Sequence, residues 1–271
     1  MSKSKGTKGP GKARKPPHAS TIKISGRVTP KATVKVTAKG TNHGNAKGTG
    51  ASGRGLAVRV KSAKFRPVGS TAWLKRQLND PYVALAKAEG WRSRAAYKLI
   101  EMDDKLHLLK PGKRVVDLGA APGGWTQVAV QRVKAQDGKG KVVALDILPW
   151  ENVAGATCIT LDFLDDSAPA ILKQAMGGPA DIVLSDMAAP TTGHGPTDHL
   201  RIIGLAEAAW QFATEVLAPG GTFICKVFQG GTEGKLLKML KTRCAVVKHI
   251  KPPASRKGSA EVYVVALEFK G

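Results

Sequence analysis

The stretch DLGAAPGGW, residues 117–125, continues the apolar run RVVDL (114–118) and leads into a helical pattern over 123–133. A glycine-rich turn between a buried strand and a helix is typical of a ligand-binding loop. Its glycines let a ligand approach the backbone closely, and the helix N-terminus offers free N–H groups to an anion. The spacing differs from GxGxxG, and Pro122 removes one donor N–H. The turn therefore favours a ligand with a small anionic end, such as a carboxylate, over a diphosphate.

Acidic residues stand where the next two strands are expected to end. Asp146 closes the run KVVALD (141–146), and Asp162 closes the run CITLD (158–162). In doubly wound folds an acid about 20 residues past the glycine turn binds ribose hydroxyls. A ribose, a carboxylate and an adenine together favour S-adenosylmethionine over NAD as the ligand. The alternative is that both acids merely cap the ends of strands.

Apolar runs typical of buried strands alternate with stretches of helical periodicity. Such alternation predicts an α/β fold with a mainly parallel sheet and helices on both faces. Strands are expected at 114–118, 141–146, 158–162, 181–186, 222–227, 246–250 and 261–268. Helices are expected at 71–79, from 80 onward, and at 91–104, 123–133, 168–175, 197–217 and 232–242.

Charge is distributed unevenly along the 271 residues. The chain has 43 Lys and Arg against 20 Asp and Glu, yet residues 1–79 carry 19 basic side chains and no acid. Residues 1–66 have too little apolar surface to offset the entropy of ordering, which predicts a flexible basic arm before one domain over 67–271. The arm favours a polyanionic partner, nucleic acid or the ribosome before a membrane. A transit peptide and a solubility tail are the alternatives.

The sequence argues against several classes of protein. No uncharged apolar run approaches the ~18 residues of a membrane span, and the N-terminus lacks the apolar region of a secretory signal. Cys158, Cys225 and Cys244 form neither an even disulfide framework nor a CxxC pair, which fits a reducing, cytoplasmic location. His194 and His199 have no third ligand motif nearby, so no metal is expected.

Six separated motifs stand in order along the chain: SRAAYKL (93–99), DLGAAPGGWTQ (117–127), DILP (146–149), SDMAAPTTG (185–193), CKVFQGG (225–231) and SRKGSAEVY (255–263). Together they resemble the FtsJ/RrmJ (RlmE) family over about 70–271. This family comprises S-adenosylmethionine-dependent 2′-O-ribose methyltransferases of large-subunit ribosomal RNA. The long basic arm departs from the family's compact pattern.

The resemblance implies a Rossmann-like S-adenosylmethionine-dependent methyltransferase fold, a mostly parallel seven-stranded sheet with the last strand antiparallel. It also implies a monomer that acts on a uridine of 23S-type RNA, in the 50S ribosomal subunit or its late precursor. By motif, the family's catalytic tetrad falls on Lys98, Asp186, Lys226 and Glu261. Its cofactor contacts fall on Gly123, Trp125, Asp146, Asp162 and Asp186.

Methyl transfer to a sugar hydroxyl makes demands that these residue types can meet. The hydroxyl is a poor nucleophile, so oxygen, methyl and sulfur must be aligned and a proton removed as the bond forms. Lys226 is the candidate base, but a lysine ammonium cannot accept a proton. Burial and a second cation at Lys98 favour the neutral amine, whereas Asp186 and Glu261 favour the ammonium. Lys226 is therefore either the base or a charged group that orients the 2′-oxygen.

The position of Glu261 predicts the direction of the last strand. Glu261 starts the last expected strand, and ligands of doubly wound folds bind at the carboxyl edge of the parallel strands. Its carboxylate reaches that edge only if the last strand runs antiparallel to its neighbours.

Substrate binding is expected beside the tetrad. A basic rim that binds RNA phosphates is expected at Lys75, Arg76, Arg92 and Arg94.

Two alternatives to ribosomal RNA methylation stay open. One is a non-catalytic RNA-binding or ribosome-assembly factor with this fold, and the other is the same chemistry on transfer RNA or an mRNA cap.

Overall fold

The computed structural model describes residues 71, 74–75, 77–230 and 233–271. These residues fall within one compact unit, Arg54–Gly271. The basic arm expected at the start of the chain lies outside the described residues. Within the described part of the chain, no helix is long and apolar enough to cross a membrane.

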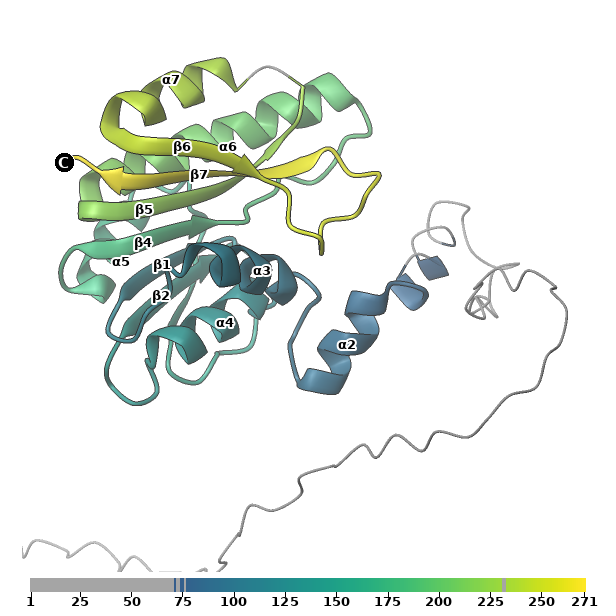
Figure 1. Ribbon diagram of the computed structural model, residues 1–271, viewed down its shortest axis with the longest axis horizontal. Helices are drawn as coiled ribbons and strands as arrows, with labels where there is room; N and C mark the ends of the chain where they lie inside the picture. The colour runs from purple at the N-terminus through teal and green to yellow at the C-terminus, as the bar shows by residue number, and fades with distance from the viewer. Residues whose placement is uncertain (1–70, 72–73, 76, 231–232) are drawn as a thin grey trace, which may run out of the picture. The chain divides into compact units, whose positions relative to one another are not determined.

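Seven strands of the described region form one sheet. They are β1 (Arg114–Leu118), β2 (Lys141–Asp146), β3 (Thr157–Thr160), β4 (Ala180–Ser185), β5 (Leu217–Phe228), β6 (Cys244–Ile250) and β7 (Glu261–Phe269). Their order across the sheet is β3-β2-β1-β4-β5-β7-β6 (Figure 1). Neighbours from β3 to β5 are parallel, whereas β7 runs antiparallel to both β5 and β6. The predicted mostly parallel sheet with a reversed last strand is confirmed.

The helices of the described region lie between these strands and before β1. They are α2 (Pro81–Glu89), α3 (Ala96–Leu106), α4 (Gly124–Val133), α5 (Ala168–Met176), α6 (Gly195–Val216) and α7 (Gly234–Arg243). As expected, α2 starts at Asp80-Pro81, and the Asp80 side chain accepts a hydrogen bond from Tyr82 N at the N-cap. The helix expected from Trp91 begins only at Ala96, because the left-handed Gly90 (φ +79°) ends α2 and a turn follows it.

Strand ends differ slightly from the expected positions, and two acids are affected. β3 ends at Thr160 and β4 at Ser185, so Asp162 and Asp186 lie in the loops just beyond them. β5 begins at Leu217 rather than near 222, with a register irregularity opposite 180–182. Both acids therefore stand on loop backbone at the carboxyl edge of the sheet.

Two apolar clusters cover the two faces of the sheet. On β4, Val183 belongs to the cluster with α5, α6 and α7, whereas its neighbour Leu184 belongs to the cluster with α3 and α4. Successive strand residues point to opposite faces, so a strand buried on both faces reads as a continuous apolar run. With both faces covered, the loops at the carboxyl edge are the part of the sheet open to a ligand.

Candidate active site

The glycine turn passes very close to the loop that follows β4. Gly119 has φ +76°, and a Cβ added there would lie 2.7 Å from backbone atoms of Met187. A side chain is excluded on both counts, because L residues rarely adopt this conformation and the contact is a clash. The N–H groups of Gly119 and Ala120 both donate to the Leu145 carbonyl at the end of β2. The turn is thus fixed between the ends of β2 and β4.

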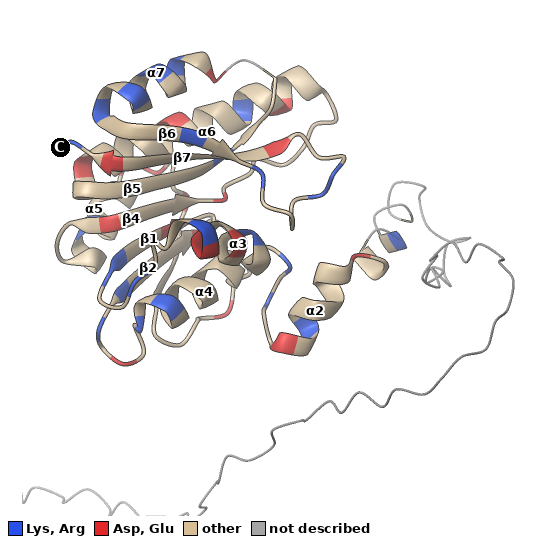
Figure 2. Ribbon diagram, in the orientation of Figure 1, with Lys and Arg blue, Asp and Glu red and all other residues tan. Residues whose placement is uncertain are grey.

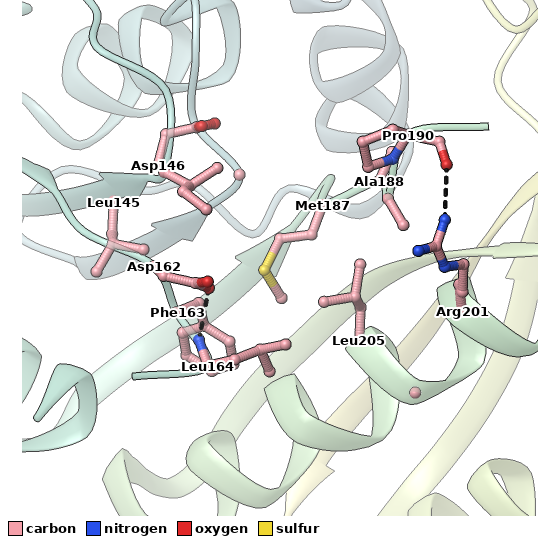
Figure 3. A pocket seen from close by; sticks show the side chains of 14 residues that line it. Leu145, Asp146, Asp162, Phe163, Leu164, Met187, Ala188, Pro190, Arg201 and Leu205 are labelled. Atoms are coloured by element: carbon pink, nitrogen blue, oxygen red, sulfur yellow. Dashed lines mark hydrogen bonds between the residues drawn. The ribbon is translucent and has the colours of Figure 1, made fainter. Parts of the chain in front are cut away.

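A cavity of about 560 Å³ opens beside this turn, against helix α6. Its volume falls in the range of small-molecule sites. Figure 3 shows Asp146 and Asp162 on one side of the cavity and Arg201 on the other. The structure therefore brings the two acids expected to bind a cofactor to one cavity.

The two acids are oriented by backbone N–H groups. Asp146 Oδ2 accepts from Ala121 N and Asp146 Oδ1 from Leu148 N, both at 2.8 Å. Asp162 Oδ1 accepts from Leu164 N at 2.9 Å. A carboxylate oxygen has a second lone pair, so each held oxygen can still accept a ligand hydroxyl or amino group.

Gly123 and Trp125 are not among the residues that line this cavity. The Trp125 side chain is buried, and its indole N–H donates to the Ala95 carbonyl at 2.8 Å. Its ring lies 5.4 Å from that of Tyr263, between centroids. The indole thus packs in the core around α3, and the cofactor contacts expected of Gly123 and Trp125 stay predictions.

The four residues of the expected tetrad come together at the same edge of the sheet. Lys98 Nζ lies 2.8 Å from Glu261 Oε2, and Lys226 Nζ lies 3.0 Å from Asp186 Oδ1. Lys226 Nζ also donates to the Asp186 carbonyl at 2.6 Å. Both lysine side chains are more than 90% buried, at 9% and 8% exposure. Antiparallel pairing places Glu261 opposite Phe228, which brings its carboxylate to this edge as the geometry demanded.

Tyr263 joins the two ion pairs, and sequence reasoning missed it. Its hydroxyl donates to Asp186 Oδ1 at 2.8 Å and accepts from Lys98 Nζ at 3.0 Å. Tyr263 lies two residues after Glu261 on β7, so both side chains point to the same face of the strand. That two-residue spacing within SRKGSAEVY was the available signal.

Electrostatics keep Asp186 ionised and Tyr263 protonated. Burial alone would raise the pKa of Asp186, but the charges of Lys226 and Lys98 and hydrogen bonds from Lys226 and Tyr263 outweigh it and hold this pKa below its usual value. Burial, and then the charges of Asp186 and Glu261, raise the pKa of Tyr263 well above its usual value. Tyr263 is therefore a neutral hydroxyl donor to a carboxylate.

Replacing Tyr263 with phenylalanine tests this bridge. The ring and its packing are kept, but Asp186 loses one donor and Lys98 loses one acceptor. A hydrogen bond to a charged group contributes about 1.5–3 kcal/mol, so we expect any reaction that depends on this cluster to slow by about ten- to a hundredfold. Steady-state rates across a range of pH measure the loss. The matched control is Tyr82→Phe, which removes a tyrosine hydroxyl that donates to Glu101. Equal rates for Tyr263→Phe and Tyr82→Phe would show that the bridge has no catalytic effect.

Asp117, in the glycine-turn motif, is a buried acid next to the site. Its side chain is 0% exposed, and Oδ2 accepts from Thr126 Oγ1 at 2.7 Å. Its Oδ1 has no hydrogen-bond partner among the described residues. Burial, with smaller contributions from Asp186 and Asp146, raises the pKa of Asp117 to about 7 against the hydrogen bond from Thr126.

Protein stability should therefore fall as the pH rises from about 4 to about 7. Over this range folded Asp117 keeps a proton that the unfolded chain has lost, so rising pH favours unfolding. A shift of about three units corresponds to about 4 kcal/mol, complete above pH ~7. Asp117→Asn should lose most of this pH dependence, measured by urea unfolding at several pH values. Asp166→Asn, at an exposed turn, should keep it, and a wild-type slope in Asp117→Asn would contradict the assignment.

The expected basic rim is only partly available for RNA. Arg92 donates to the carbonyls of Pro122, Glu151 and Asn152. Arg94 pairs with Asp80 at 2.9 Å. Lys75 is exposed, and the fourth member of the rim lies outside the described residues. The two arginines thus hold loops together, which sequence spacing could not reveal.

The reversed seventh strand, and the cavity at the carboxyl ends of β1, β2 and β4, place this protein among the Rossmann-like methyltransferases. Within that class, the chain belongs to the FtsJ-like methyltransferase family, whose family model matches residues 91–269.

Proteins similar in sequence align with this chain over most of its length. A Rhodospirillum rubrum protein named ribosomal RNA large subunit methyltransferase E is 68% identical over 219 residues, 80% of this chain and 83% of the relative. A Paramagnetospirillum magneticum protein of the same name is 64% identical over 228 residues, 83% and 93% of the two chains. The crystal structure of a Plasmodium falciparum protein assigned as a ribosomal RNA methyltransferase has a TM-score of 0.60 and 32% identity, covering 67% of this chain and 100% of that one.

Proposed function

We propose that this protein transfers a methyl group from S-adenosylmethionine to the ribose 2′-oxygen of a uridine in large-subunit ribosomal RNA. The proposed setting is the 50S subunit or its late precursor in the cytoplasm, with a monomeric enzyme and no metal. The observation that carries the proposal is the buried Lys226–Asp186 pair, which directly precedes the residues, Met187 to Pro190, that line a cofactor-sized cavity. The names of the relatives support the RNA substrate.

The residues around the cavity fit S-adenosylmethionine. Asp146 presents acceptor oxygens suited to ribose hydroxyls, and Asp162 adds a second acceptor. Leu145 and Phe163 supply an apolar wall suited to a purine ring, and Gly119 lines the cavity with backbone alone. When bound there, the cofactor supplies a methyl group on a positively charged sulfur.

The loop after β4 connects the cavity with the four charged residues. Asp186 holds Lys226, and the next residues, Met187 to Pro190, line the cavity. A ribose beside Lys226 would therefore lie next to the methyl donor. Holding the reacting atoms aligned in this way can supply ~7–11 kcal/mol of the barrier.

Lys226 Nζ has three bonding positions besides its carbon. The carboxylate and the carbonyl of Asp186 take two of them. The third can face the 2′-oxygen, as an N–H that orients it or as a lone pair that accepts its proton. Lys98 bonds both Glu261 and the Tyr263 hydroxyl, and this hydroxyl donates to Asp186. These contacts fix the position of Asp186, and Asp186 in turn fixes the direction of Lys226.

Mapping 2′-O-methyl sites in all cellular RNA, with and without the gene, tests the proposal. We expect one large-subunit uridine to lose its methyl group, and wild-type protein but not Lys226→Ala to restore it. An unchanged methylation map of ribosomal RNA would refute the proposed substrate. A methyl group lost from transfer RNA or capped RNA would identify that RNA as the substrate instead. Restoration of subunit assembly by Lys226→Ala without methylation would favour the assembly-factor alternative.

A further inference from the structure

A second stretch of uncompensated positive charge lies inside the folded domain. Residues 234–260 contain eight Lys and Arg and no acid, whereas the rest of 80–271 has 16 basic and 20 acidic residues. This segment comprises α7, β6 and the β6–β7 loop. Figure 2 shows basic positions recurring along α7 and on the β6–β7 loop. The near neutrality of the domain therefore hides a local concentration of positive charge.

The outer face of α7 presents lysines at a regular spacing. Leu236 and Leu240 are fully buried against the sheet, whereas Lys235, Lys238 and Lys241 are exposed. A spacing of three residues places these lysines on one side of the helix. An open groove of about 490 Å³ lies beside Lys238 and Lys241 and is lined also by Gly234, Leu237 and Thr242.

Intramolecular contacts leave most of this charge free. Lys235 pairs with Glu207 at 3.2 Å, but its side chain is 74% exposed. Within the described part of the chain, no hydrogen bond or ion pair engages the ammonium groups of Lys238 and Lys241. Like charges three or four residues apart destabilise a helix by a few tenths of a kcal/mol, and α7 has no acid to relieve them. The helix dipole stabilises a cation near the C-terminus of α7, which explains a lysine at Lys241 but not at Lys235 or Lys238.

The basic segment begins and ends at the carboxyl edge of the parallel strands, here called the catalytic edge, where Lys98, Asp186, Lys226 and Glu261 meet. It follows β5, which carries Lys226, and it ends just before Glu261, where β7 begins. α7 starts at this edge and runs back along the face of the sheet (Figure 1). Because α7 starts at this edge, a polyanion seated at the active site could extend toward its lysines.

We propose that the face of α7 formed by Lys235, Lys238 and Lys241, here called the α7 lysine face, binds the sugar–phosphate backbone of the substrate RNA outside the catalytic edge. The inference rests on the proposed function for the identity of the RNA. Lysine is a point-charge partner for phosphate, and this face carries no aromatic side chain for base stacking. The contact therefore contributes affinity and orientation rather than base readout.

The double variant Lys238→Gln/Lys241→Gln in the full chain tests this surface. Glutamine keeps the length and nearly the helix propensity of lysine, so folding should be preserved. We expect the dissociation constant for an in vitro transcript of large-subunit ribosomal RNA to rise about tenfold in moderate salt. The slope of log K against log salt should fall in magnitude by about 1.4–1.8, for two lost phosphate contacts. Fluorescence anisotropy over a salt series measures both, and the binding of S-adenosylhomocysteine should be unchanged.

The control removes the same charge elsewhere. Lys110 and Lys139 are exposed in the loops that precede β1 and β2, at the opposite edge of the sheet from the active site. Contacts made by the basic arm are common to all variants and cancel in the comparison. If Lys110→Gln/Lys139→Gln lowers affinity and slope as much as the α7 variant, or if neither changes them, the proposal fails.

Two further outcomes are distinguishable. If the α7 variant binds naked RNA normally but whole large subunits weakly, the face binds an acidic protein instead, and the RNA assignment is wrong. If the wild-type protein binds the transcript but methylates no ribosomal RNA, the proposed function fails. The effect of the α7 variant on RNA affinity would still be measured.

Discussion

Lys226→Ala should lower the rate of methyl transfer by about 10³-fold or more, within the effect expected for loss of a positioned proton acceptor and its alignment of the nucleophile. The reason is geometric: Lys226 Nζ is held by two oxygens of Asp186, and alanine leaves nothing to meet the 2′-oxygen. Single-turnover methylation of ribosomal RNA measures the rate. Binding of S-adenosylhomocysteine should persist, which separates lost chemistry from lost folding.

Lys226→Arg separates the two roles left open for this residue. Arginine keeps the positive charge beside Asp186 but is always protonated in proteins, so it cannot accept a proton. If Lys226 is the base, arginine should be nearly as inactive as alanine. If arginine restores most of the rate, Lys226 acts as a charged orienting group. Lys139→Ala, at an exposed loop, is the neutral control and should keep wild-type activity.

Asp146→Ala should weaken S-adenosylmethionine binding by about 100-fold. A hydrogen bond to a charged group contributes about 1.5–3 kcal/mol, and this carboxylate is expected to receive ribose hydroxyls while it holds the turn through Ala121 N and Leu148 N. Titration calorimetry measures the affinity directly. The loss should also appear as a smaller rise of Tm with added S-adenosylhomocysteine.

Asp137→Ala is the control for this prediction, because Asp137 is an exposed acid in the α4–β2 loop. Its affinity for the cofactor should equal that of the wild type. If Asp146→Ala binds as tightly as Asp137→Ala, the acid only closes the end of β2, and the cofactor is held elsewhere.

Much of the fold was accessible from sequence because its signals are local. Buried parallel strands read as apolar runs, and the helices between them follow a period of 3.6 residues. The carboxyl ends of parallel strands meet at one edge, so acids after two successive strands predict a shared site. Asp146 and Asp162 do line one cavity. The family resemblance added the reversed last strand, which the pairing of β7 with β5 confirms.

Side-chain direction was less accessible, because it depends on contacts between distant segments. Lys98 and Glu261 are 163 residues apart and meet at 2.8 Å. Tyr263 becomes the link between the ion pairs only because β7 runs beside β5 and carries it to Lys98 and Asp186. Arg94, expected at the RNA surface, instead pairs with Asp80, because the turn before α3 brings it to the N-cap of α2.

The class of fold, the position of the glycine turn and the residue types at the carboxyl edge could all be predicted from the sequence. These follow from backbone periodicity and from residues adjacent in the chain. Tertiary packing sets which charged groups pair, that Tyr263 bridges them, that the Trp125 indole packs into the core, and that Lys238 and Lys241 of α7 have no side-chain partner among the described residues. Each of these depends on long-range packing and burial, which select one partner for a side chain among many that the sequence allows.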